Sequence, residues 1–288
     1  MRIRATVAAV TGALALSAVV VPAAQAADAG PSYRAQAVKA LSASGKSAFT
    51  ATTAADLGVS FSNFKIAGAV KVGTTNHVST KVTYTLTHGA NYDINSDDFA
   101  NGPFLYKGSS PETADNVLFG DAPASCTATS ETTADCAGLI DIYPGDDELF
   151  NSDAGTWSGG GLALQYTTED GTVQADLGTT KVQRLSKLTV NASPEPVTKG
   201  RTITVTGRLT RANWESHKYT GYVTQPVKLQ FRKKGSSTYT TLKTVKTDSY
   251  GNLKSTVTAS VDGYFRYAFA GTTTTPAVNA TGDFVDVR

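Results

Sequence analysis

Apolar and polar residues alternate along much of this chain, and that alternation is typical of β-strands with one buried face. Residues 78–89, VSTKVTYTLTHG, give a clear example, because Val82, Tyr84 and Leu86 share one face while lysine and threonine occupy the other. A strand of this kind is half-buried, with its apolar face against a core. Abundant Thr, Ser, Val, Gly and Tyr favour strands and turns over helices.

The strands fall into two series, which predicts an all-β protein of two tandem domains. The first series occupies residues 57–185, where Asp170-Gly171 predicts a tight turn between two strands. The second series, 186–288, has about seven short strands, which is the outline of a β-sandwich of about 100 residues. The junction VQRLSKLTV contains neither Pro nor Gly, so we expect a short connection between the domains.

The amino-terminal segment predicts export from the cell. Two arginines precede an apolar run that ends in AQA, so residues 1–26 have the features of a signal peptide cut after Ala26. A membrane anchor is the alternative, but the run is rich in small residues and ends at a cleavage site. We therefore expect a secreted, extracellular protein with no membrane span. Residues 27–56 are predicted to be a flexible leader with one helical turn near RAQAVKAL.

Charge is divided unevenly between the two series. Residues 1–186 contain 11 Lys and Arg against 18 Asp and Glu, a net charge of −7. Residues 187–288 contain 15 against 6, a net charge of +9. A basic second domain would suit an anionic partner. The alternatives are that the two domains face each other or that both surfaces are simply solvated, and the sequence leaves these alternatives open.

Cys126 and Cys136 are the only cysteines, and an even number in an exported chain predicts a disulfide. The bond would close a short hairpin or loop, for which chain entropy predicts a stabilisation of about 3 kcal/mol. The disulfide that joins the two sheets of antibody domains needs cysteines far apart in sequence, so this one is of a different kind. Redox or metal chemistry would need closer cysteines or a nearby histidine.

Residues 141–157, DIYPGDDELFNSDAGTW, form the densest acidic stretch in the chain. Their spacing does not fit the helix-flanked calcium loop, which needs acidic or amide residues at alternate positions followed by glycine. A looser calcium site would use Asp146, Asp147 and Glu148, and calcium is the one cofactor that the sequence suggests. A pair of catalytic carboxylates, as in glycosidases, is another interpretation, although no platform for a sugar ring is evident beside it.

The second half of this stretch is better explained as a turn. SDAGTW resembles the D-x-[AG]-x-Y sequence that precedes strand F in immunoglobulin-like domains, with Trp157 in the aromatic position. The second series repeats the arrangement in VDGYFRY, where Gly263 and Phe265 correspond to Gly155 and Trp157. We expect Asp153 to belong to the turn that aims Trp157 into a sandwich core.

Two sequence features support a resemblance to a known family. The second series, from SKLTVNASPEPVTKG to VDGYFRYAFAGT, resembles the Ig-like β-sandwich modules of secreted actinobacterial proteins. The first, with its closely spaced cysteines and DAGTW, resembles the domain that often precedes such modules. The resemblance covers nearly all of the chain after the signal peptide and implies export and two tandem immunoglobulin-like β-sandwiches. It implies little about activity, because this fold carries many unrelated functions.

The second domain contains the best candidate contact surface. Residues 211–225, RANWESHKYTGYVTQ, are predicted to form a long loop that presents Trp214, Tyr219 and Tyr222 beside basic residues. The alternative is that Trp214 folds back over the edge of the core. FRKKG adds three cations at a strand end: Arg232, Lys233 and Lys234. Such a surface suits an anionic cell-wall polymer, a polysaccharide or another extracellular protein, whereas nucleic acid is not expected.

Motifs for catalysis are absent from the sequence, so we assign no catalytic residue. There is no G-x-S-x-G or H-E-x-x-H motif, and His77, His88 and His217 occur in polar contexts typical of solvated loops. The leading hypothesis is a secreted, non-enzymatic Ig-like protein that acts as an extracellular interaction or cell-surface binding module. An extracellular calcium-binding protein and a secreted hydrolase with dispersed catalytic residues are the alternatives.

Overall fold

In the computed structural model, the described residues are 32–44 and 56–288. Residues 32–288 belong to one compact unit. The predicted signal peptide, 1–26, and the leader residues 27–31 and 45–55 lie outside the described residues, so export stays a prediction. Among the described helices, none is long and apolar enough to cross a bilayer.

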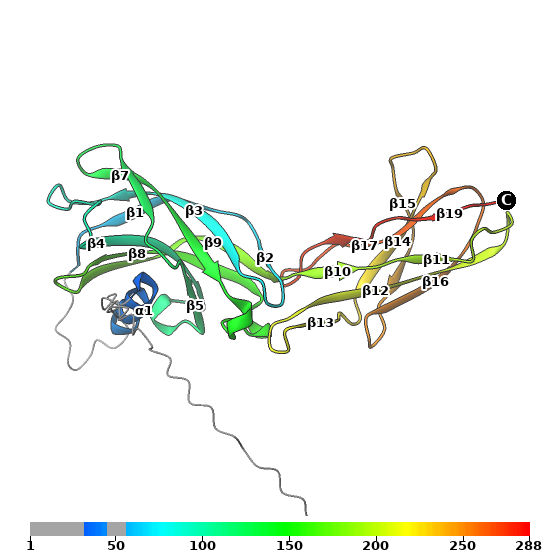
Figure 1. The fold of residues 1–288 in the computed structure, drawn as a ribbon, viewed down its shortest axis with the longest axis horizontal. Coiled ribbons are helices and arrows are strands. Elements are labelled where there is room, and N and C mark those ends of the chain that lie inside the picture. Colours follow the sequence, from blue (N-terminus) through cyan, green and yellow to red (C-terminus); the bar gives the residue numbers. More distant parts are fainter. Residues whose placement is uncertain (1–31, 45–55) are drawn as a thin grey trace, which may run out of the picture. The chain divides into compact units, whose positions relative to one another are not determined.

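Two sheets form a first sandwich from the first series of strands (Figure 1). One sheet has the order β1-β3-β7-β6 and the other has the order β2-β9-β8-β4-β5. All neighbours are antiparallel except β2 and β9, which run parallel. The strands are β1 (Ser60–Ile66), β2 (Val70–Val72), β3 (Val78–Thr87), β4 (Phe99–Lys107), β5 (Asn116–Phe119), β6 (Ser125–Ala128), β7 (Thr133–Ile142), β8 (Gly155–Gln165) and β9 (Asp170–Arg184). Three short 3-10 turns lie between them: η1 (Pro111–Thr113), η2 (Pro144–Asp146) and η3 (Asn151–Asp153).

The core between these two sheets follows the alternation seen in the sequence. On β3, Val82, Tyr84 and Leu86 are buried as predicted, and the threonines between them lie on the opposite face of the strand. The predicted disulfide between Cys126 and Cys136 is confirmed, and it joins directly opposed residues of β6 and β7. It therefore links two neighbouring strands of one sheet rather than the two sheets.

A twelve-residue helix, α1 (Tyr33–Ser44), covers the outer face of the β4–β8 sheet (Figure 1). The leader was expected to be flexible with a single helical turn, and for these residues that expectation is wrong. Tyr33, Ala37 and Leu41 are spaced by four, so they share one helical face and pack on Phe104 of the sheet. Strand β4 is consequently buried on both faces. This explains why its sequence, FANGPFLYK, lacks the alternation of apolar and polar residues.

A second sandwich forms from the second series, again with two sheets. In one sheet β12 pairs with β10, β11, β13 and β16, and the other has the order β15-β14-β17-β18 with β19 also paired to β17. The strands are β10 (Ser186–Leu188), β11 (Asn191–Ser193), β12 (Thr202–Asn213), β13 (Lys218–Gly221), β14 (Pro226–Lys233), β15 (Thr240–Lys246), β16 (Asn252–Thr258), β17 (Gly263–Phe269), β18 (Val278–Asn279) and β19 (Asp283–Val285).

The strand order of both sandwiches is immunoglobulin-like. With strands lettered in chain order, β1-β3-β7-β6 corresponds to A-B-E-D and β9-β8-β4-β5 to G-F-C-C′. In the second sandwich, β11-β12-β16 corresponds to A-B-E and β15-β14-β17-β19 to C′-C-F-G. The expected all-β, immunoglobulin-like fold is therefore confirmed, while the domain limits at 57–185 and 186–288 stay a prediction.

Two local expectations differ from the structure. The turn between β8 and β9 lies at residues 166–169, and Glu169 takes the left-handed conformation with φ of 57°. Asp170 and Gly171 already pair within β9, so the turn lies just before these two residues and not at them. Residues 211–225 do not form one long loop, because Arg211–Asn213 complete β12 and pair with β13 as a hairpin.

Candidate binding sites

The turn before β8 holds Trp157 in the first core. Its ring is 1% exposed, and its indole N–H donates to the backbone carbonyl of Asp153 at 2.7 Å. The Asp153 carboxylate in turn accepts the backbone N–H of Phe150 at 2.8 Å, which closes the preceding 3-10 turn. The corresponding aromatic of the second sandwich, Phe265, is also buried. These contacts are those expected for a turn that directs an aromatic side chain into a sandwich core.

The three residues proposed for calcium, Asp146, Asp147 and Glu148, are not among the described side chains whose donor atoms gather within 4.8 Å of one another. Glu148 accepts the backbone N–H of Tyr143 at 2.6 Å and forms an ion pair with Arg34 of α1. Asp147 has a side chain 76% exposed and lies 3.4 Å from Nε2 of His217. Asp146 is exposed. The structure thus gives Glu148 and Asp147 separate partners within the protein.

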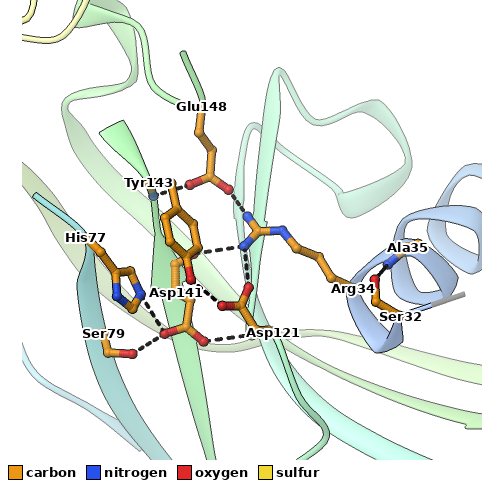
Figure 2. A network of polar contacts seen from close by, with 9 residues as sticks. All are labelled: Ser32, Arg34, Ala35, His77, Ser79, Asp121, Asp141, Tyr143 and Glu148. Carbon is orange, nitrogen blue, oxygen red and sulfur yellow. Dashed lines mark hydrogen bonds and ion pairs between the residues drawn. The ribbon is translucent and has the colours of Figure 1, made fainter. Parts of the chain in front are cut away.

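A polar network instead gathers around Asp141, near the carboxyl end of β7 (Figure 2). The buried Asp141 carboxylate lies 3.0 Å from Nε2 of His77 and accepts the hydroxyl of Ser79. Its other oxygen accepts the backbone N–H of Asp121 at 3.0 Å. Burial raises the pKa of Asp141, but these hydrogen bonds outweigh the burial, and the pKa ends below its ordinary value.

Aromatic and cationic groups complete this network. The Tyr143 ring stacks on His77 with centroids 4.3 Å apart and planes 4° apart, and its hydroxyl donates to Asp121. Arg34 forms ion pairs with Asp121 and Glu148, so it ties α1 to the loops of the sandwich (Figure 2). The hydrogen bond from Tyr143 to Asp121 raises the pKa of the tyrosine.

Three histidines were expected on solvated loops, and the structure places them differently. His88 is only 6% exposed and contacts the carbonyl of Gly89, so for this residue the expectation is wrong. His77 belongs to the Asp141 network, and His217 lies beside Asp147. Among the described residues, one group that could hold a metal ion consists of His77, Asp121 and Asp141, whose donor atoms lie within 4.8 Å of one another.

The hairpin at residues 211–221 packs its aromatic residues rather than presenting them all. Trp214 is 0% exposed, joins the core of the first sandwich, and donates its indole N–H to the carbonyl of Gly73 at 2.9 Å. It therefore offers no surface to a ligand in this structure. Tyr219 and Tyr222 are half-buried and lie under the cations of Lys187 and Arg211, at 3.7 and 3.9 Å from the ring centroids.

The outer face of the β15-β14-β17-β19 sheet carries an alternating row of cations and aromatic rings, which we call the cation–aromatic face. Arg232 lies 4.0 Å from the ring centroid of Tyr264 and 5.3 Å from that of Tyr239, and Arg266 lies 3.8 Å from that of Tyr239. At the β19 side, the ring of Phe284 lies 5.2 Å from Tyr264. These two arginines and three aromatic side chains are half-buried, whereas Lys234 beside Phe284 is exposed. The members are Arg232, Tyr239, Tyr264, Arg266, Phe284 and Lys234.

Neither arginine of this face has a carboxylate partner within the described part of the chain. Arg232 donates to the carbonyl of Ser236 at 2.6 Å, and Arg266 donates to the side-chain oxygen of Gln230 at 2.9 Å. Lys234, in contrast, lies 3.4 Å from Asp262, and Lys233 is exposed. Two guanidinium groups therefore lie over tyrosine rings, and no described carboxylate forms an ion pair with either of them.

Sequence reasoning found Arg232 and Lys234 but missed the other four members of the cation–aromatic face. The alternation in GYFRYAF held a usable signal, because Phe265 and Tyr267 are core residues and Tyr264 and Arg266 must then face outward. Tyr239 and Phe284 join the face through strand pairing and a turn, for which no local sequence pattern exists. The same is true of His77 and Asp121, which are 44 residues apart and meet only in the folded sandwich.

The fold and these surfaces define an immunoglobulin-like sandwich protein with a cation–aromatic sheet face. Neither a protein-family description nor a curated protein matches this chain in sequence. Among solved structures, a marsupial T cell receptor is similar at 12% identity over 80% of this chain and 73% of the receptor chain, with a TM-score of 0.35. An I-band fragment of titin is similar at 10% identity over 80% of this chain and 65% of that chain, with a TM-score of 0.31.

Proposed function

We propose that this protein is a secreted, non-enzymatic binding module that attaches to an anionic polysaccharide through the cation–aromatic face. Export is supported by the signal-peptide features of residues 1–26 and by the disulfide, a bond typical of oxidising compartments. The observation that carries the proposal is the pair Arg232 and Arg266, which lie over tyrosine rings and have no carboxylate partner among residues 32–44 and 56–288.

The chemistry of this face suits a polymer that combines sugar rings with carboxylate or phosphate groups. A guanidinium presents a planar fork that pairs with carboxylate or phosphate in two parallel hydrogen bonds. Tyrosine rings beside it offer apolar surface against which the C–H face of a sugar ring packs. Stacking also restrains the arginine side chains before the ligand arrives, so less side-chain entropy is lost on binding.

Binding of the purified protein to an acidic polysaccharide tests the proposal, with a neutral polysaccharide of similar length in parallel. We expect binding to the acidic polymer at low salt that weakens strongly as salt rises, because exposed charges are screened. The double change Arg232→Gln and Arg266→Gln should weaken binding by about tenfold or more, since each charged contact contributes about 1 kcal/mol or more.

The matched control removes two charges from elsewhere on the second sandwich. Arg201 and Lys254 are exposed, Arg201 directly precedes β12 and Lys254 lies on β16 of the other sheet. Arg201→Gln with Lys254→Gln therefore changes the net charge equally. This control should retain most of the affinity. Equal losses in both double variants would mean that only net charge matters, and equal affinity for the neutral polymer would reject the proposal.

A further inference from the structure

The polar network around Asp141 contains a set of side chains with the composition and placement of a metal site. An imidazole nitrogen from His77 and carboxylate oxygens from Asp121 and Asp141 lie within 4.8 Å of one another. In a tetrahedral zinc site, metal–ligand bonds of about 2.0–2.2 Å put neighbouring donor atoms roughly 3.3–3.6 Å apart. The donor atoms that lie farthest apart, at up to 4.8 Å, must approach one another to reach that spacing. His77 Nε2 and Asp141 Oδ1, which are 3.0 Å apart, must instead separate slightly.

Three separate segments supply these donors, and each donor side chain also contacts another group of the protein that fixes its position. The Asp141 carboxylate is buried and fixed by the Ser79 hydroxyl and the backbone N–H of Asp121. The His77 ring is fixed by its parallel stack on Tyr143, whose hydroxyl also holds Asp121 (Figure 2). Such supporting contacts are those that orient metal ligands in established sites.

The network has a net negative charge that a divalent cation would neutralise. Asp121, Asp141 and Glu148 carry three negative charges, and Arg34 supplies one positive charge. With His77 neutral, two negative charges remain at the same end of the first sandwich. The mixture of one imidazole and two carboxylates is typical of transition-metal ligands, whereas calcium prefers sites built from oxygen alone.

We propose that His77, Asp121 and Asp141 bind a divalent transition-metal ion such as Zn²⁺, with solvent completing the coordination. This site is distinct from the cation–aromatic face and does not depend on polysaccharide binding. It also differs from the calcium site considered from sequence, because Asp146 and Asp147 contribute nothing to it. Arg34 lies beside the ion in this arrangement, so metal binding and the position of α1 are electrostatically coupled.

Zinc titration of the purified protein tests this site by calorimetry and thermal melting, with cobalt absorption as a report on the ligands. We expect one zinc ion per chain and a melting temperature that rises with zinc, because the native state alone holds the assembled site. His77→Ala should abolish both effects, and its fold is checked by its metal-free melting curve. His217→Ala removes another histidine that lies beside a carboxylate and should leave zinc binding intact.

Arg34→Gln gives an outcome that a purely structural network would not produce. Removing the cation should tighten zinc binding by about fivefold, since a like charge beside the ion is lost, even though α1 loses its ion pairs with Asp121 and Glu148. A melting temperature that zinc leaves unchanged, or a zinc effect that survives His77→Ala, overturns the proposal. Weaker zinc binding in Arg34→Gln overturns it as well, and calcium in place of zinc should give no shift.

Discussion

At the scale of single residues, one large aromatic side chain in each core pairs its polar atom with a backbone carbonyl. Trp157 donates to the carbonyl of Asp153 in the first core, and Tyr267 donates to the carbonyl of Val205 in the second at 2.9 Å. Both rings are almost completely buried. These bonds allow large aromatic side chains with a polar atom to fill a core without leaving that atom unsatisfied.

Ionisation of Tyr267 makes the free energy of unfolding of the second sandwich depend on pH, and the raised pKa of this residue gives the direction. Burial raises the pKa of Tyr267 to about 12, above the ordinary value of about 10. The neutral phenol therefore stabilises the fold fully below about pH 10, and this contribution is lost as pH rises through about 12. Tyr267→Phe should lower the free energy of unfolding by about 1 kcal/mol at pH 7.

Urea denaturation between pH 7 and 11.5 measures this effect. The stability difference between the wild type and Tyr267→Phe should shrink above pH 10, because only the wild type must keep that phenol neutral. A difference that stays constant across this range would show that Tyr267 does not titrate with the fold.

At the scale of elements, α1 is an added layer on one face of the first sandwich. Its own sequence explains its packing face, but its docking depends on the apolar outer face of β4 and β8. Gly102 of β4 illustrates the fit, because a Cβ at that position would lie 2.2 Å from the Tyr33 hydroxyl. The absence of a side chain at Gly102 therefore leaves space for the Tyr33 side chain of α1.

Ala37 and Ala35 allow the docking of α1 to be tested with the same substitution on two faces. Ala37 is fully buried and Ala35 is exposed. Ala37→Asp would bury an unpaired carboxylate, which costs about 3 kcal/mol or more, and should raise amide exchange in α1 on the order of a hundredfold. Ala35→Asp should leave exchange nearly unchanged. Equal protection in the two variants would mean that α1 does not pack through Ala37.

At the scale of the whole described unit, the two sandwiches share side chains at their connection. Only Leu185 separates β9 from β10, as the junction without Pro or Gly predicted. Trp214 of the second sandwich lies in the first core, and its backbone N–H donates to the side chain of Asn151 at 3.1 Å. Glu215 accepts two further hydrogen bonds from Asn151. The acidic stretch 141–157 therefore has a role in contact between the two halves of the chain.

Trp214→Ala tests whether this contact makes the two sandwiches unfold together. Truncating a fully buried tryptophan costs about 3–5 kcal/mol, so the variant should lose stability and its calorimetric transition should separate into two. Tyr250→Ala is the control, because the Tyr250 side chain is 70% exposed and lies outside both cores. A single unshifted transition in Trp214→Ala would contradict this role.

The sequence by itself determined the features that depend on near neighbours. Alternation fixed the buried face of β3, the cysteine pair predicted the disulfide, and SDAGTW predicted the turn that buries Trp157. Each of these features requires only that the chain fold into strands and turns with a known period.

Only the tertiary structure decided which distant residues meet. Arg34 pairs with Asp121 across 87 residues, and Trp214 reaches Gly73 across 141. The cation–aromatic face likewise depends on β14, β17 and β19 lying side by side with Arg232 opposite Tyr264. The physical reason is that sheet pairing and sandwich packing bring these groups together, while a sequence pattern describes only the side on which each residue of a strand lies.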